Sequence, residues 1–92
     1  MISVPTSEAD ILDRLILPSQ GDLAPEAARS LLTIQFGPDD RQRMQELARR
    51  AKEGDLSPEE LSQAEAYERV GNLLGLLQSK ARLSLKQLAG ER

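Results

Sequence analysis

Apolar residues recur every three or four positions in four stretches of the chain, and each stretch is bounded by proline, glycine or a capping residue. This spacing places apolar side chains on one face of a helix, and the boundaries are typical signals for helix starts and ends. The sequence therefore predicts an all-α fold, a small helical bundle of two short N-terminal helices, a helical hairpin and a long C-terminal helix. The predicted ranges are 7–17, 25–35, 38–53 and 58–88, within a single helical domain over residues 1–92.

The predicted boundaries depend on local capping chemistry. A serine followed three residues later by an acid matches a capping box, and proline is favoured at the first position of a helix. A glycine directly after an apolar stripe is typical of a helix end. The residues expected in these roles are Ser7 with Asp10, Pro25, Pro38, Ser57 with Glu60, and Gly54 at the end of the third helix.

The last predicted helix is much longer than the helix before it. About 30 residues of helix extend ~45 Å, whereas about 15 residues extend ~22 Å. Folded back through the turn at Gly54, the third helix covers about half of the last one. The uncovered half is the Leu-rich C-terminal half, and its apolar face needs a cover. One candidate is the pair of N-terminal helices, and the other is a second copy or a different protein.

This C-terminal half contains the candidate partner-binding surface. Gly71 and Gly75 lie four residues apart, and each glycine costs about 1 kcal/mol relative to alanine inside a helix. Close approach of another helix is one reason for such glycines, and relief of local packing is the other. The basic end of the helix either complements the helix dipole or attracts an acidic partner. The predicted partner-binding residues are Gly71, Leu73, Leu74, Gly75, Leu77, Lys80, Arg82 and Leu83.

The composition argues against catalysis. The chain has no cysteine and no histidine, so it lacks the commonest general base and the commonest metal ligand. Adjacent acids occur at Asp39–Asp40 and at Glu59–Glu60, but both pairs start helices, where acids stabilise the dipole. We therefore expect a protein that is not an enzyme, with no catalytic, metal or cofactor-binding residues and no cofactor.

The N-terminal sequence has no basic region before an apolar run, as a signal peptide would. The longest apolar-rich stretch, residues 70–77, is far shorter than the ~20 residues that span a bilayer. These features predict a cytoplasmic protein that makes no use of a membrane.

Charge is arranged in blocks of alternating sign. The net charge is −5 over residues 1–40, +3 over 41–53, −5 over 54–68 and +4 over 69–92. Such blocks are consistent with solvated helix faces, or with pairing between helices or molecules. A helix-turn-helix interpretation would make the last helix the recognition element, but its first turns are acidic and phosphates would repel them. The sequence thus disfavours direct nucleic-acid binding.

Residues 36–86 resemble a family of small, mostly uncharacterised bacterial helical proteins. The resemblance covers rather more than half of the chain and implies no catalytic role. Members of this family are often encoded beside HNH-type nucleases, which implies an antitoxin-like or regulatory partner of such a nuclease. The matching pieces include Phe36, Asp40-Arg41, Met44, Leu47-Ala48, Ala51-Lys52-Glu53-Gly54, Leu56-Ser57-Pro58-Glu59-Glu60, Tyr67, Arg69-Val70-Gly71, Leu73-Leu74 and Leu76-Leu77-Gln78-Ser79-Lys80-Ala81-Arg82-Leu83.

The sequence therefore predicts a non-catalytic protein–protein interaction module, for which the resemblance implies an HNH-type nuclease as partner. One alternative is a self-contained structural homodimer, in which the last helix pairs with a second copy of itself. The other is a nucleic-acid-binding module that uses two basic clusters, one over residues 41–52 and one over residues 80–86. The identity of the partner, the oligomeric state and the continuity of the last helix through Gly71 and Gly75 stay open at this point.

Overall fold

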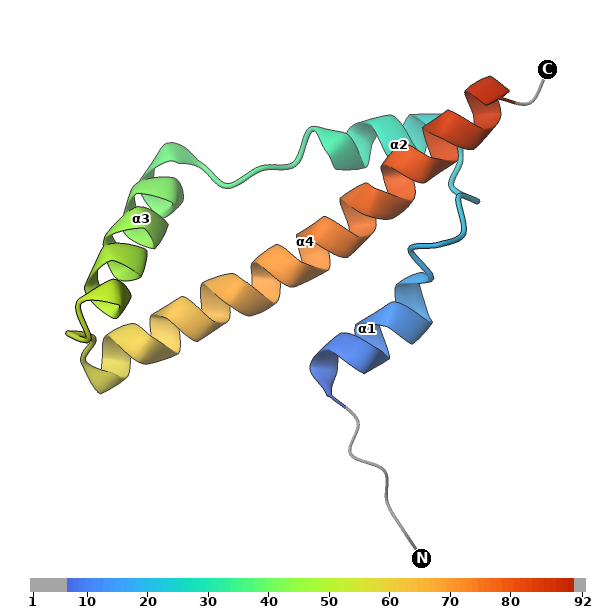
Figure 1. Ribbon diagram of the computed structural model, residues 1–92. Helices are drawn as coiled ribbons and strands as arrows, with labels where there is room; N and C mark the ends of the chain where they lie inside the picture. Colours follow the sequence, from blue (N-terminus) through green and yellow to red (C-terminus); the bar gives the residue numbers. More distant parts are fainter. Residues whose placement is uncertain (1–6, 91–92) are drawn as a thin grey trace, which may run out of the picture. The chain divides into compact units, whose positions relative to one another are not determined.

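The computed structural model describes residues 7–90, and this part of the chain contains four α-helices and no strand (Figure 1). The prediction of an all-α fold is confirmed. The helices are α1 (Glu8–Ile16), α2 (Pro25–Leu32), α3 (Pro38–Lys52) and α4 (Pro58–Gly90). Helix α4 is one continuous helix of 33 residues that passes through Gly71 and Gly75 without interruption.

The two predicted capping boxes are present. The Ser7 hydroxyl accepts from the Asp10 amide at 3.1 Å, and the Asp10 carboxylate accepts from the Ser7 amide at 3.3 Å. At the start of α4, Ser57 and Glu60 make the same pair of bonds at 3.1 and 3.0 Å. Each box satisfies two amides that the first turn of a helix leaves without a partner. These local bonds explain why the sequence places both helix starts correctly.

Helix α2 ends three residues before its predicted end. The amides of Thr33 and Ile34 donate to carbonyls three residues back, at Ser30 and Leu31, with distances of 3.1 and 3.2 Å. Such bonds tighten the final turn and end the α-helical ladder. The side-chain amide of Gln78, on α4, then donates to the Leu31 and Ile34 carbonyls at 3.0 and 2.7 Å. A side chain that is distant in sequence therefore hydrogen-bonds to the carbonyls at the end of α2. The local sequence pattern around α2 does not reveal this contact.

The described chain divides into two compact units, and α4 contributes one half to each. Unit 1 contains the described residues up to Ile34 together with those from Asn72 onward, and unit 2 is Gln35–Gly71. The prediction of one domain over residues 1–92 stays a prediction, because two compact units that share a helix can still unfold together.

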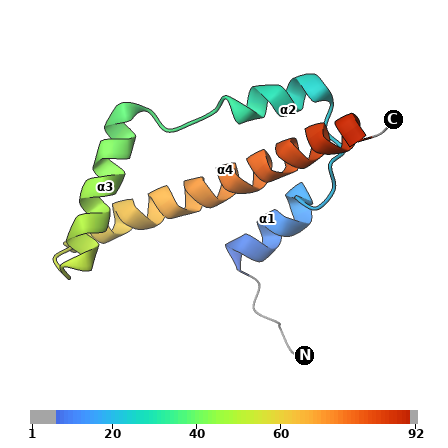
Figure 2. The same cartoon turned by 45° about the horizontal axis from the view of Figure 1, so that its top comes forward.

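In unit 1, α1 and α2 lie along the C-terminal half of α4 (Figure 2). Ala28 of α2 and Ala81 of α4 are completely buried, and alanine on both helices allows their backbones to approach closely. The loop between α1 and α2 also contacts α4, where the Leu23 amide donates to the Ser84 hydroxyl at 3.1 Å. The two N-terminal helices, which were one of the two candidates, therefore cover the C-terminal half of α4.

Unit 2 is a helical hairpin of α3 and the N-terminal half of α4. Gly54 ends the hairpin's first helix with a φ of +69°, a left-handed conformation that glycine adopts without strain. The amides of Gly54 and Asp55 donate to the carbonyls of Ala51 and Arg50 at 3.0 and 2.9 Å. Leu47 is the buried apolar residue of this hairpin.

Few large apolar side chains are buried in the part of the chain that the structure describes. Its buried apolar residues are Ala28, Leu47 and Ala81, whereas eight large apolar residues are exposed. The exposed set is Ile11, Leu15, Leu17, Ile34, Leu61, Val70, Leu73 and Leu88. Among residues 7–90, no helix combines the length and the apolar character that crossing a membrane requires.

Candidate functional site

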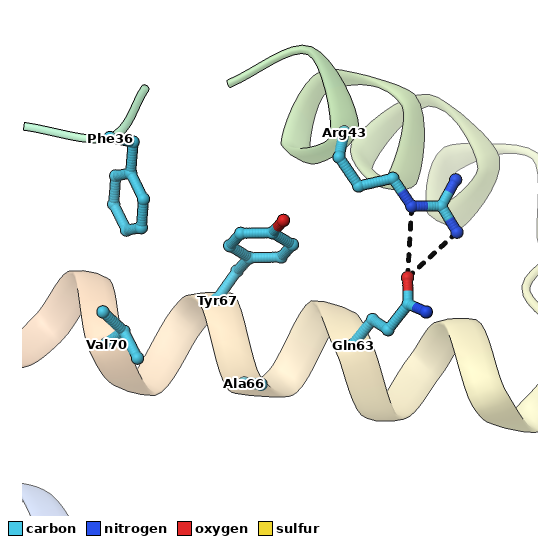
Figure 3. Close-up of a pocket in the computed structure, with 6 residues that line it drawn as sticks. All are labelled: Phe36, Arg43, Gln63, Ala66, Tyr67 and Val70. Atoms are coloured by element: carbon cyan, nitrogen blue, oxygen red, sulfur yellow. Dashed lines mark hydrogen bonds between the residues drawn. The ribbon is translucent and has the colours of Figure 1, made fainter. Parts of the chain in front are cut away.

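Unit 2 contains an open groove of about 530 Å³ between the start of α3 and the N-terminal half of α4 (Figure 3). Its lining residues come from the segment before α3, from α3 and from α4. They are Phe36, Arg43, Gln63, Ala66, Tyr67 and Val70. Ala66 and Val70 lie one turn apart on α4, and the exposed fraction of Val70 is 53%. The groove thus exposes an apolar row of α4 to solvent.

The two aromatic residues of the sequence lie together in this groove. The rings of Phe36 and Tyr67 meet edge to face, with centroids 6.0 Å apart and an angle of 65° between their planes. This geometry brings the positive edge of one ring to the negative face of the other. The Tyr67 hydroxyl donates to the Asp40 carboxylate at 2.6 Å. Donation to this carboxylate raises the pKa of Tyr67, because deprotonation would end the hydrogen bond.

Arg43 forms the polar wall of the groove. Its guanidinium donates through Nε and Nη2 to the Gln63 side-chain oxygen, at 3.1 and 2.9 Å (Figure 3). It also pairs with Glu46 of α3, one turn further along. These bonds tie α3 to α4 within the hairpin and hold the aliphatic part of Arg43 beside the apolar row of α4.

A second ion pair fixes the closed end of the hairpin. The Glu60 carboxylate accepts from Arg50 at 2.6 Å, and Arg43 lies 3.7 Å from the same oxygen. The Ser57 amide that donates to this carboxylate, followed by the charge of Arg50, holds the pKa of Glu60 below its ordinary value. The charged side chains that link α3 and α4 are therefore satisfied by each other, whereas the apolar row of the groove is exposed.

The residues of the predicted partner-binding surface do not share one environment. Gly75, Leu73 and Arg82 are exposed, and the exposed fraction of Leu73 is 38%. Half-buried positions are Gly71, Leu74, Leu77 and Leu83. Lys80 is buried within unit 1. That this set binds a partner stays a prediction, and its exposed members are the ones that another molecule can reach in this arrangement.

Lys80 points into unit 1 rather than toward solvent. Its ammonium group lies 2.6 Å from the Asp22 carboxylate and donates to the Leu17 carbonyl at 3.4 Å. The Lys80 carbonyl accepts from the Ser84 hydroxyl at 2.8 Å, and the same hydroxyl accepts from the Leu23 amide. The bond from Lys80 holds the pKa of Asp22 below its ordinary value. This cluster fastens the loop between α1 and α2 to α4.

Gly71 and Gly75 have open space where a side chain would begin. A Cβ atom built on either glycine would find no atom of a neighbouring element within 4 Å. No close contact within its own unit therefore explains either glycine. Gly21 is different, because its Cβ would lie 2.8 Å from the Leu83 carbonyl carbon and 2.8 Å from the Ser84 amide nitrogen. Close packing therefore requires glycine at Gly21, in the loop that lies on α4, and not at a position within α4.

The described side chains form no candidate metal site. Within residues 7–90, no group of three or more carboxylates, histidines or cysteines lies close enough together to hold a metal ion. In the same part of the chain, every buried side-chain nitrogen and oxygen has a hydrogen-bond partner. The groove combines apolar surface with a few hydrogen-bonded polar groups, as many ligand-binding sites do.

The groove is the feature that the sequence analysis missed. Its signal was present, since Phe36 and Tyr67 are the two aromatic residues of the chain and aromatic residues are enriched at interfaces. The pattern along α4 directed attention to the leucines after Gly71 instead. The contact of Phe36 with Tyr67 joins residues 31 positions apart, and periodicity within one helix does not report such a contact.

Comparison with protein-family models, with curated proteins and with solved structures finds no match to this chain.

Proposed function

We propose that the protein is a non-catalytic protein-interaction module, and that the groove of unit 2 is its main contact surface. The observation that carries this proposal is the groove itself, in which Val70 and Ala66 lie exposed beside the Phe36–Tyr67 pair. Apolar patches that are rimmed by polar residues mark contact sites on many soluble proteins. Of the eight exposed large apolar residues of the described chain, Val70 is the one that lines this groove.

The chemistry of the groove favours a protein partner over a nucleic acid. A groove for nucleic acid needs unpaired cations along its walls to contact phosphates. Arg43, the cation in this groove, is bonded to Glu46 and Gln63 and lies near Glu60. The apolar row on α4 instead suits the apolar face of a partner helix.

A nuclease is the first partner to test, and this choice depends on the family resemblance alone. An antitoxin-like protein would bind the nuclease tightly and suppress its activity. Purified HNH-type nuclease from the same genome, if one is encoded nearby, would be mixed with the protein and assayed for binding by calorimetry.

The general proposal is tested by affinity capture from nuclease-treated lysate of the cells that express the protein. Three baits are compared: the wild type, Val70→Asp in the groove, and Leu61→Asp elsewhere on α4. The exposed fractions of Val70 and Leu61 are similar, at 53% and 49%, so neither change should unfold the chain. We expect one stoichiometric protein with the wild type and Leu61→Asp, and its loss with Val70→Asp. Equal recovery with all three baits would assign binding to another surface, and no recovered protein would contradict the proposal.

A further inference from the structure

Helix α4 passes from unit 2 to unit 1 between Gly71 and Asn72. Around this crossing, over residues 68–73, no residue is buried, and all of them except the half-buried Gly71 are exposed. Six residues make more than one and a half turns of an α-helix, so this stretch covers every side of α4. Neither unit therefore buries a face of the helix where the helix joins them.

Two glycines weaken α4 at the same place. Gly71 is the last residue of unit 2, and Gly75 follows one turn later. Glycine is less favourable than alanine inside a helix, because it loses more backbone freedom when the helix forms. Most of the stability of a helix in a protein comes from packing of its apolar face, and residues 68–73 bury no such face. Since the space at both Cβ positions is open, the glycines ease the opening of α4 without improving a contact.

The described chain passes between the units at one other place, between Ile34 and Gln35, and there it is not helical. The Ile34 carbonyl accepts from Gln78 of unit 1 at 2.7 Å, and the Phe36 ring meets Tyr67 of unit 2. Gln35, between these two anchored residues, is exposed. Loop residues of this kind absorb the changes in φ and ψ that a hinge motion needs. The second connection can therefore follow a bend in α4.

We propose that α4 bends at residues 71–75, and that this hinge allows the two units to move independently. In a straight α-helix the carbonyls of residues 71–75 accept from the amides four residues later, so a bend opens the bonds of amides 75–79. The part of the groove lining that lies on α4 ends at Val70, before the hinge, and the groove stays intact when α4 bends. The inference goes beyond the proposed function and needs no partner.

The first test measures the distance between two spin labels on α4 of the full chain by double electron–electron resonance. The chain has no cysteine, so Ser62→Cys and Lys86→Cys provide the two labelling sites. Both residues are exposed, and they lie on opposite sides of the hinge. They are 24 positions apart in the sequence, which corresponds to ~36 Å along a straight helix. The comparison is the same labelled chain with Gly71→Ala and Gly75→Ala.

We expect a broad distribution of distances when both glycines are present, with a component shorter than ~36 Å. After both alanine changes we expect one narrow distribution near that length, because alanine favours the unbroken helix. A narrow distribution with both glycines present would overturn the inference, since α4 would then be straight and rigid. A distribution that stays equally broad after the alanine changes would also overturn it, because the glycines would not be the source of the bending.

The second test measures amide hydrogen exchange of the unlabelled chain by NMR. Local opening of the hinge should make the amides of residues 75–79 exchange faster than those of residues 64–68 and 81–85. The double alanine variant should slow exchange at residues 75–79 by about 10-fold, because alanine is favoured over glycine at two positions, and should leave the flanking amides unchanged.

Ser62→Ala is the matched control, because it also places alanine at an exposed position of α4, outside the hinge. It should leave exchange at residues 75–79 unchanged. Equal exchange along α4 in the wild type, or equal slowing by the control, would contradict a local hinge. Neither test involves a partner, so a failed hinge leaves the proposed function standing, and a failed capture experiment leaves the hinge standing.

Discussion

Replacing Gly21 by alanine tests how closely the loop after α1 approaches α4. The new Cβ atom would lie 2.7 Å from the Gln87 side-chain oxygen and 2.8 Å from backbone atoms of Leu83 and Ser84. Gln87 can swing away, but the backbone of a helix cannot, so the loop must move. Such overpacking costs about 1–3 kcal/mol. The same movement stretches the bond from the Leu23 amide to Ser84, worth about 1 kcal/mol.

We therefore expect Gly21→Ala to lower the free energy of unfolding by about 2 kcal/mol. With an m-value of about 1.5 kcal/mol/M, the urea midpoint would fall by about 1.3 M. Circular dichroism at increasing urea concentration measures this shift directly. The φ angle of Gly21 lies outside the left-handed region, so the expected loss is steric and owes nothing to backbone strain.

Gly75→Ala is the control, because it is the same chemical change at a glycine with no neighbouring atom within 4 Å of its Cβ position. Alanine inside a helix is favoured over glycine by about 0.5–1 kcal/mol, so this variant should be more stable than the wild type. Opposite signs for the two variants would support the described contact. A Gly21→Ala protein as stable as the wild type would show that the loop does not lie against α4.

Three further predictions concern individual polar contacts. Tyr67 is the one tyrosine of the chain, so alkaline absorbance titration reports its pKa, which should lie above the ordinary value and fall in Asp40→Asn. The stability that this bond contributes is fully present below about pH 10 and is lost as the pH rises through the raised pKa. NMR titration should find the pKa of Asp22 below its ordinary value in the wild type, and higher in Lys80→Met than in the wild type. The stability that the Asp22–Lys80 pair contributes is fully present above about pH 4, and it is lost as the pH falls through the lowered pKa of Asp22. Ser57→Ala removes a capping box and should lower stability by about 1 kcal/mol in urea unfolding.

Helix starts and the end of α3 could be predicted from the sequence because their causes are local. Ser7 caps α1, Ser57 caps α4, and Gly54 takes the left-handed conformation after α3. Each interaction spans at most a few residues, so the order of residue types along the chain contains it. The end of α2 was placed too late because it depends on Gln78, which is more than 40 residues away.

Lys80 shows why the candidate surface was harder to predict than the fold. On the sequence it belongs to a basic helix end, beside Arg82 and Lys86, and such residues usually face solvent. In the structure the loop between α1 and α2 brings Asp22 and the Leu17 carbonyl to its ammonium group. Which of three similar cations is buried depends on where a distant loop lies, and neither periodicity nor charge along α4 contains that information.

Helix α1 has two apolar rows, a half-buried one of Leu12 and Ile16 and an exposed one of Ile11 and Leu15. A helix of nine residues is marginal on its own, and α1 gains support from its Ser7 cap and from the half-buried row of Leu12 and Ile16. Ile11 and Leu15 add apolar surface that faces water, and covering it would contribute about 2–3 kcal/mol. This is a sizeable share of the stability of a small domain, so a contact that covers Ile11 and Leu15 would stabilise α1.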